Sequence, residues 1–288
     1  MTPCFSTEDA IRYMRGSADY RELVDEAYLD EDGQAATERF GRSVEFRETL
    51  QLLDGSVEGK RVLDLGAGTG LATQAFARAG AAFVLALEPD CSDVVGLGKL
   101  RAAPGDLAIG SVASWAEAMP LADESVDVVY CRQVLHHLHR LPEALVECAR
   151  VLRPGGIFVA TREHVVDDDA QLATFLAEHP VHQLAGGEHA WSLDAYLAAI
   201  RGAGLELTSE LGPWDAVINA FPAVSDADEL RRGPAVVLSH RFGPVVGRLG
   251  GLPGVRDLLW SRLRRPKPGR LYTFVAVKPA GRDGSTDG

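Results

Sequence analysis

The chain has 288 residues, of which 46% are hydrophobic and 24% are charged. This composition is close to the average of globular proteins and excludes a disordered chain, a collagen-like chain and a small disulfide scaffold. The formal net charge is −12. A field of that sign repels phosphate, so nucleic acid is not expected as a partner of the surface as a whole.

No segment of the sequence predicts a membrane helix or a secretion signal. The longest apolar stretch, residues 79–87, is far shorter than the ~20 residues that a membrane helix needs. The N-terminus has no basic segment followed by an apolar one. Four cysteines lie far apart and form no CxxC pair, which indicates reduced thiols. We therefore expect a cytoplasmic protein without stable membrane insertion.

Residues 1–55 carry apolar side chains at helical spacing, and a pair of glycines ends this zone. We expect a helical lid over residues 1–55 and a main domain over residues 56–288. Within the lid, Tyr13 and Tyr20 are candidate substrate contacts. The alternative for both tyrosines is packing in the core.

Residues 60–163 alternate between short apolar strands and helices. The expected strands are 61–65, 82–87, 107–110, 126–131 and 157–161, and the expected helices are 71–79 and 141–151. Strands joined by helical crossovers predict a parallel sheet with helices on both faces. Such sheets bind ligands beyond the carboxyl ends of their strands, so the functional residues are expected there.

The C-terminal part is expected to hold a helical cap over about residues 164–203 and two strands, 205–211 and 271–277. The two strands would be neighbours in the sheet, although about 60 residues separate them. A connection of that length is usually functional or has a structure of its own. We therefore expect an insertion over about residues 213–270.

A glycine-rich turn follows the first strand. Residues 62–70 end in glycines spaced GxGxG, whereas the dinucleotide fingerprint GxGxxG would need a glycine at Leu71. The spacing argues against a pyrophosphate cradle and leaves bare backbone for the carbon chain of a ligand. The helix that follows offers free N–H groups and a positive end to a carboxylate. Glu88, 18 residues past Gly70, can accept both hydroxyls of a ribose.

Six motifs in a fixed order resemble those of one family. They are residues 62–70, 87–90, 116–121, 126–131, 133–138 and 149–156. In content and spacing they resemble the class I S-adenosylmethionine-dependent methyltransferases, in the type 11-like branch that acts on small molecules. The resemblance implies a Rossmann-like, doubly wound α/β fold whose seven-stranded sheet is mostly parallel with the last strand antiparallel, plus helical lid segments. It also implies S-adenosylmethionine as the cofactor.

The resemblance further implies which residues contact this cofactor. The acid and glycines of the turn would line its methionine end, the acid after strand 2 would hold its ribose, and the residues after strand 4 would face its sulfonium. The full set is Asp64, Gly66, Ala67, Gly68, Gly70, Glu88, Pro89, Trp115, Ala116, Glu117, Cys131, Arg132 and Gln133. One position departs from the family, because Trp115 stands where an Asp often binds the adenine amine. We expect adenine to stack on Trp115 and to bond to Ala116, or Glu117 to replace the Asp.

Histidines and a glutamate follow strands 4 and 5, on the acceptor side. A base helps methyl transfer to a hydroxyl, and histidine titrates in the right range. We expect His136, or else His137, to be this base, with Glu163 orienting it or the acceptor and His164 as a further acceptor contact. The alternative is that these side chains pack under the sheet edge or cap a turn. No metal is expected, because the HHxH segment has no Cys or acidic partner at metal-binding spacing.

Residues 186–192 interrupt the helical cap and read Gly-Gly-Glu-His-Ala-Trp-Ser. This composition predicts a loop that closes over the acceptor, with His189 and Trp191 as substrate contacts. The alternative is a linker in which Ser192 caps the next helix.

Residues 231–270 contain ten basic residues and one acidic residue, a net charge of +9, so the rest of the chain carries −21. Within this stretch, residues 255–265 predict a basic amphipathic helix. Its apolar residues are Val255, Leu258, Leu259 and Leu263. Three interpretations stay open: packing of the apolar face with solvated arginines, recognition of an anionic acceptor, or contact with anionic lipid.

We therefore predict an enzyme that transfers a methyl group from S-adenosylmethionine to a small-molecule acceptor, with oxygen as the expected methylated atom. A specialised metabolite or a sugar is the expected acceptor, since the frequent Ala, Arg and Gly residues are typical of GC-rich bacterial genomes. One alternative is a methyltransferase for RNA or a carrier-protein-bound intermediate, which only the basic stretch supports. The others are a non-catalytic protein that binds S-adenosylmethionine, suggested by Trp115, and a dehydrogenase, against which Leu71 argues.

Overall fold

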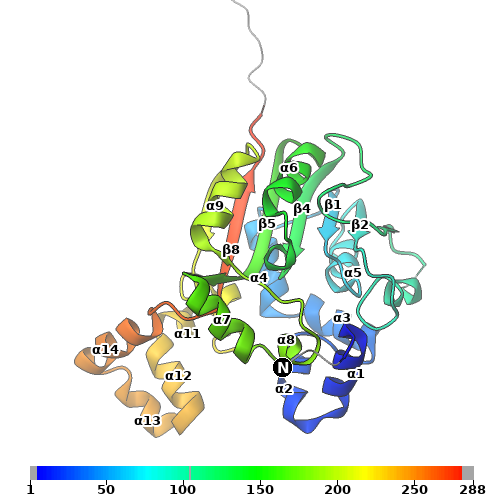
Figure 1. Cartoon of the computed structure of the whole chain (residues 1–288). Helices are drawn as coiled ribbons and strands as arrows, with labels where there is room; N and C mark the ends of the chain where they lie inside the picture. The colour runs from blue at the N-terminus through cyan, green and yellow to red at the C-terminus, as the bar shows by residue number, and fades with distance from the viewer. Residues whose placement is uncertain (1–4, 104, 281–288) are drawn as a thin grey trace, which may run out of the picture.

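The computed structural model describes residues 5–103 and 105–280. Cys4 and the outermost residues of the expected lid and main domain lie outside this range. The described part is built on one sheet with helices on both faces (Figure 1).

The sheet has the strand order β3-β2-β1-β4-β5-β8-β7, and a short strand, β6, pairs with β5 beside this path. The strands are β1 (Arg61–Leu65), β2 (Phe83–Leu87), β3 (Ile109–Val112), β4 (Val126–Arg132), β5 (Leu152–Val166), β6 (Trp191–Ser192), β7 (Glu206–Leu211) and β8 (Arg270–Val277). The pairs from β3 through β5 are parallel, and β8 is antiparallel to both of its neighbours. The predicted α/β fold with an antiparallel last strand is confirmed.

Two strands differ from their predicted bounds. The weak third strand begins two residues later than expected, at Ile109. β5 is much longer than the apolar run 157–161, because residues 163–165 also pair with β8 and residues 165–166 pair with β6. This extension carries the chain past the edge of the parallel strands, toward the acceptor side.

The N-terminal zone is helical, as its spacing predicted. It contains α1 (Thr7–Gly16), the 3₁₀ turn η1 (Ala18–Tyr20), α2 (Arg21–Glu26), α3 (Gly33–Gly41) and α4 (Val44–Leu52). The side chains of Ser6, Asp32 and Ser43 accept backbone N–H bonds at the starts of α1, α3 and α4, which satisfies donors that a helix start leaves free.

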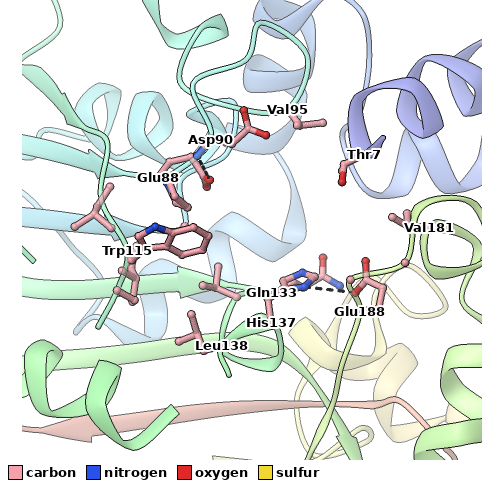
Figure 2. A pocket seen from close by; sticks show the side chains of 18 residues that line it. Thr7, Glu88, Asp90, Val95, Trp115, Gln133, His137, Leu138, Val181 and Glu188 are labelled. Carbon is pink, nitrogen blue, oxygen red and sulfur yellow. Dashed lines mark hydrogen bonds and ion pairs between the residues drawn. The ribbon is translucent and has the colours of Figure 1, made fainter. Parts of the chain in front are cut away.

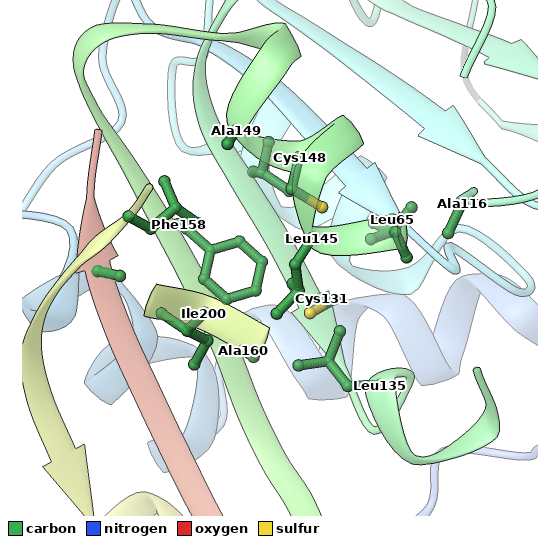
Figure 3. Close-up of a cluster of buried hydrophobic side chains, with 14 of the residues drawn as sticks. Leu65, Ala116, Cys131, Leu135, Leu145, Cys148, Ala149, Phe158, Ala160 and Ile200 are labelled. Carbon is green, nitrogen blue, oxygen red and sulfur yellow. The ribbon is translucent and has the colours of Figure 1, made fainter. Parts of the chain in front are cut away.

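The two faces of the sheet are covered by different helices (Figure 1). α4 and α5 (Leu71–Arg78) bury Phe46 and Phe76 on one face. α6 (Leu141–Val151) and α9 (Leu193–Gly202) cover the other face, where Ile200 packs in the same cluster as Phe158 (Figure 3). α9 was expected in the cap. It covers the sheet instead, since the fully buried side chains of Tyr196 and Ile200 lie on one face of the helix.

The carboxyl edge of the sheet is crossed by α1 and α8 (Pro180–Ala185) (Figure 1). Ile11 and Met14 of α1 pack with Val94, Val181 and Leu184. α7 (Asp169–Glu178) precedes α8. Two short 3₁₀ turns, η2 (Lys99–Ala102) and η3 (Leu135–His137), follow β2 and β4. The N-terminal helices and the segment after β5 thus meet over the edge where ligands are expected.

The connection between β7 and β8 has its own structure, as its length predicted. It contains α10 (Val217–Ala220), α11 (Ala227–Arg231), α12 (Gly233–Phe242), α13 (Pro244–Leu249) and α14 (Pro253–Leu263). Of the three interpretations left open for the basic helix, packing of its apolar face holds only in part, because Val255 and Leu258 are 38% and 56% exposed. Trp260 holds α14 in place instead, edge-on against Trp214. Within the described residues, no helix is long and apolar enough to cross a membrane.

Candidate functional site

A cavity of about 460 Å³ opens at the carboxyl ends of β1, β2 and β4 (Figure 2). Its walls come from these strand ends, from the start of α1 and from α8 with the loop after it. The lining residues are Thr7, Leu65, Gly66, Leu87, Glu88, Pro89, Asp90, Val95, Trp115, Ala116, Gln133, Val134, His137, Leu138, Val181, Gly186, Gly187 and Glu188. The site therefore lies at the sheet edge that the topology predicts.

The glycine turn after β1 forms one wall. Gly66 has a φ of 66°, and a Cβ atom at this position would lie 2.5 Å from Cγ2 of Val134. Gly68 and Gly70 also have positive φ values, of 51° and 80°. Residues with side chains rarely adopt this left-handed conformation. The turn consequently exposes backbone that a ligand can approach closely.

Glu88 is fixed at the end of β2 by two backbone amides. The N–H groups of Gly68 and Asp90 each donate to one of its carboxylate oxygens at 3.0 Å. Each oxygen keeps a free lone pair, and the residue lines the cavity. Burial raises the pKa of the Glu88 carboxyl. The geometry suits acceptance of two neighbouring hydroxyls.

Asp64 lies beneath the turn rather than in the cavity wall. It is buried, and the hydroxyl of Thr73 donates to its Oδ2 at 2.6 Å. Burial raises the pKa of Asp64 to about 7. This bond ties β1 to α5 and supports the turn between them.

The other predicted cofactor residues divide into two groups. Pro89, Trp115, Ala116 and Gln133 line the cavity, and the Trp115 ring stands beside Glu88 with 67% of its surface exposed (Figure 2). Residues that do not line it are Ala67, Gly68, Gly70, Glu117, Cys131 and Arg132. Cys131 is fully buried in the core beneath the site. Arg132 is held by Glu45 of α4, with Nε donating to Oε1 at 2.5 Å.

A bulge in β5 aims Glu163 at the turn after β4. The register between β5 and β8 shifts between Ala160 and Glu163, and such bulges often redirect a side chain next to an active site. Glu163 is fully buried and accepts the N–H groups of Val134 and His136 at 2.9 and 3.1 Å. The His136 ring completes this set, with Nδ1 2.8 Å from Oε2 of Glu163.

The two candidate bases have different access to the cavity. His136 is 2% exposed and is not part of the lining, whereas His137 lines the cavity. Burial lowers the pKa of the His136 imidazole to about 3, so it is neutral at neutral pH. The pKa of His137 is also lowered by desolvation, although its side chain is 44% exposed. The structure thus brings the predicted pair together but turns only His137 toward a ligand.

Glu188 is a site residue that the sequence did not single out. It comes from the loop after α8 and lines the cavity. Its Oε2 lies 3.6 Å from Nδ1 of His137 (Figure 2) and 3.8 Å from Nε2 of His136. Burial raises the pKa of Glu188 to about 7. The Gly-Gly-Glu segment was the only indication of Glu188 in the sequence. Local spacing could not show that its partner would be His137, about 50 residues earlier in the chain.

The predicted substrate contacts do not line the cavity. Thr7 of α1 does so in place of Tyr13, because Thr7 shares the inner face of the helix with Ile11 and Met14 and Tyr13 points away. Tyr20 stands edge-on against the Tyr13 ring.

The two loop contacts and His164 also face other partners. Nε1 of Trp191 donates to the Leu138 carbonyl at 3.1 Å. The His189 ring packs edge-on against the Trp191 ring. Nδ1 of His164 is bonded to the Gly269 carbonyl at 2.8 Å. Ser192 caps α9, as the linker alternative predicted.

Comparisons with known proteins agree with this geometry. A family model described as a methyltransferase domain matches residues 63–160. The chain is 34% identical over 185 residues to a ubiquinone biosynthesis O-methyltransferase of Rhizobium etli, which covers 62% of this chain and 69% of that protein. It is 36% identical over 154 residues to the enzyme of the same name from Sinorhizobium medicae, over 53% of this chain and 58% of that protein.

Solved structures share the fold at low sequence identity. A sarcosine dimethylglycine methyltransferase structure from Galdieria sulphuraria has a TM-score of 0.57 and 17% identity, covering 96% of this chain and 99% of that one. An S-adenosylmethionine-dependent methyltransferase from Mesorhizobium loti has a TM-score of 0.55 and 19% identity, covering 83% and 99%. Motifs, fold and relatives agree: the chain belongs to the class I S-adenosylmethionine-dependent methyltransferases, in the type 11 branch, and is an enzyme that uses S-adenosylmethionine.

Proposed function

We propose that this enzyme transfers the methyl group of S-adenosylmethionine to a hydroxyl oxygen of a small molecule. The observation that carries the proposal is a continuous cavity with the glycine turn and Glu88 at one end and His137 and Glu188 at the other (Figure 2). A sulfonium methyl group is displaced in line, so both reactants must occupy one enclosed space. The relatives named as O-methyltransferases support oxygen as the acceptor atom.

The cofactor end would be bound mainly by backbone and by one carboxylate. Glu88 accepts the ribose hydroxyls with its free lone pairs. The exposed backbone at Gly66 lies along the methionine chain, and the start of α5 faces its carboxylate. Adenine stacks on Trp115 beside the backbone of Ala116. Four predicted residues do not contact the cofactor in this proposal and instead support the turn and the strand ends. They are Asp64, Gly68, Gly70 and Cys131.

The acceptor end would be formed by His137 and Glu188. Their polar atoms line the end of the cavity away from Glu88 (Figure 2), so the hydroxyl is oriented there and its proton passes to the Glu188 carboxylate. His136 does not line the cavity, and its bond to buried Glu163 makes this pair a positioning unit that sets the turn carrying His137. The O–CH₃ bond forms as the S–CH₃ bond breaks, and S-adenosylhomocysteine leaves.

The lining favours a compact acceptor with an apolar portion. Leu138 and Val181 are apolar residues of the cavity lining, so a ring or short hydrocarbon can pack in the same space as the reacting hydroxyl. No residue of the basic stretch 231–270 lines the cavity. Recognition of an anionic acceptor by these arginines is therefore not part of the proposal.

The test is an acceptor screen with purified enzyme and S-adenosylmethionine. Phenols, catechols, quinols and sugars are offered, and mass spectrometry locates any added methyl group. We expect methylation at oxygen that falls at least about tenfold in Glu188→Gln. Glu143→Gln, at an exposed position of α6, is the matched control and should retain full activity. Methylation only at nitrogen or carbon, or only of RNA or a carrier protein, would contradict the proposal.

A further inference from the structure

Four side chains converge at the acceptor end of the cavity without bonding to one another. The Glu188 carboxylate lies 3.8 Å from Nε2 of His136, 3.6 Å from Nδ1 of His137 and 3.8 Å from Nδ1 of His179. The ligand atoms of His136, His137 and Glu188 all lie within 4.8 Å of one another. We infer that His136, His137 and Glu188 form a binding site for a divalent transition-metal ion, with His179 beside the other carboxylate oxygen of Glu188 and outside this group of three.

The group is short of hydrogen bonds. Separations of 3.6 to 3.8 Å exceed hydrogen-bond distance. The Glu188 side chain is only 9% exposed, and no N–H or O–H group of the described residues donates to its carboxylate. Nδ1 of His179 is buried and has no partner among the described residues. An unpaired buried carboxylate is costly, and a cation between these atoms would compensate it.

The spacing is close to that of a coordinated ion. Bonds of 2.0 to 2.2 Å from zinc to nitrogen and oxygen place tetrahedral ligands roughly 3.3–3.6 Å apart. Oε2 of Glu188 lies 3.8 Å from Nε2 of His136 and 3.6 Å from Nδ1 of His137, and the three ligand atoms lie within 4.8 Å of one another. Coordination therefore needs an inward movement of up to about 1 Å. Because Glu188 lies in the loop after the short helix α8, movement of its side chain can supply this shift.

A buried carboxylate already orients one of the ligands. Nδ1 of His136 is bonded to Oε2 of Glu163 at 2.8 Å, so this nitrogen carries the proton and Nε2 keeps its lone pair toward Glu188. Metal-bound histidines usually have such a carboxylate behind them, which fixes the tautomer and the ring orientation. Two backbone N–H groups hold Glu163 in turn. In this inference, the buried Glu163 carboxylate holds His136 in the orientation and tautomer that metal binding requires.

The ligand types select the class of ion. Imidazole nitrogens with one carboxylate suit Zn²⁺, Co²⁺, Ni²⁺ or Fe²⁺, whereas Mg²⁺ and Ca²⁺ prefer oxygen ligands. His137 and Glu188 line the cavity, so the open face of the ion would point at the acceptor. This role rests on the proposed function: the ion would bind the acceptor hydroxyl and lower its pKa, and it would favour acceptors with two neighbouring hydroxyls.

The test uses the full chain, freed of metal by a chelator and measured without cofactor or acceptor. Calorimetry with Zn²⁺ should show one equivalent bound, and Co²⁺ should give the visible absorption of a nitrogen-ligated ion. Glu188→Gln and His137→Ala should each weaken Zn²⁺ binding at least about tenfold, and Glu163→Gln by about 10- to 100-fold. His139→Ala, at the exposed histidine of the same segment, is the matched control. Unchanged melting and cofactor binding show that each variant is folded.

The outcomes separate this inference from the proposed function. Absence of Zn²⁺ and Co²⁺ binding, or binding that His139→Ala weakens as much as Glu188→Gln, would overturn the metal site. Oxygen methylation that persists in the chelated enzyme alongside such a result would leave the proposed function standing. Zn²⁺ binding with the expected variant pattern, in an enzyme that methylates no hydroxyl, would support the site and overturn the proposed function.

Discussion

The two ends of the cavity are built in different ways. Most of the cofactor end comes from residues 62–90, which contribute the backbone conformation at Gly66 and a single carboxylate at Glu88. Trp115, Ala116 and Gln133 complete it from the ends of the neighbouring strands. The acceptor end draws Glu163, His137 and Glu188 from three separate elements. The cofactor end can therefore be read as a motif, whereas the acceptor end exists only once the chain has folded. Variants should damage the two ends independently.

The largest effect is expected at the glycine turn. In Gly66→Ala the new Cβ would meet Val134 and force a side-chain-bearing residue to a φ of 66°, at a cost of roughly 2–5 kcal/mol. We expect affinity for S-adenosylmethionine to fall about a hundredfold or more, as measured by calorimetry. Gly202→Ala, where nothing lies within 4 Å of the new Cβ, should bind the cofactor normally. Similar binding by both variants would show that the turn does not approach the cofactor.

The second prediction concerns the carboxylate after β2. Glu88→Ala removes the acceptor for the Gly68 and Asp90 amides together with the proposed ribose contact. Bonds to a charged group contribute about 1.5–3 kcal/mol each, so affinity for S-adenosylmethionine should fall about 10- to 100-fold. Glu88→Gln should lose less, because one oxygen remains. A Glu88→Ala variant with normal cofactor affinity would remove Glu88 from the binding site.

At the acceptor end, Glu163→Gln should slow catalysis without weakening the binding of the cofactor. Glutamine keeps the size of the side chain but loses one acceptor oxygen, so the His136 ring and the turn before His137 are less well fixed. We expect kcat to fall about tenfold or more, with S-adenosylmethionine affinity within about twofold of wild type. Parallel losses of kcat, cofactor affinity and melting temperature would indicate a purely structural role.

The smallest effects are expected in the N-terminal helix. Tyr13 points away from the cavity and Thr7 lines it, so Tyr13→Ala should leave kcat/KM within about twofold. Thr7→Phe should raise the acceptor KM by about tenfold, because the larger ring occupies space that the acceptor needs. Steady-state kinetics on any acceptor from the screen distinguishes the two. The opposite ranking would restore the tyrosines as substrate contacts.

The sequence predicted the sheet and its helices well because periodicity and glycine signals are local. The helix 141–151 and the antiparallel last strand were confirmed at the expected places. α9 was misplaced in the cap, since its pattern shows an apolar face but not which surface covers it. The same limit applies to α14, where Val255 and Leu258 form an apolar pattern yet remain exposed.

Whether a predicted cofactor residue lines the cavity depends on whether its position is set by its own strand or by a partner far away in the chain. Gly66, Glu88 and Gln133 line the cavity because a strand end places them there. Arg132 follows the same strand, but its side chain is taken by Glu45, about 90 residues earlier. Glu188 was missed for the same reason, since two of its neighbours, His136 and His137, lie about 50 residues away in the chain. Long-range pairing of charged groups is what local spacing does not encode.

The most direct test measures cofactor binding and methyl transfer, which depend on the two ends of the cavity, in a single variant. Glu188→Gln is titrated with S-adenosylmethionine and assayed for single-turnover methyl transfer to a hydroxyl acceptor. We predict cofactor affinity within about twofold of wild type and a transfer rate at least about tenfold lower. A variant that loses both properties, or keeps both, would contradict the division of the cavity into a cofactor end and an acceptor end.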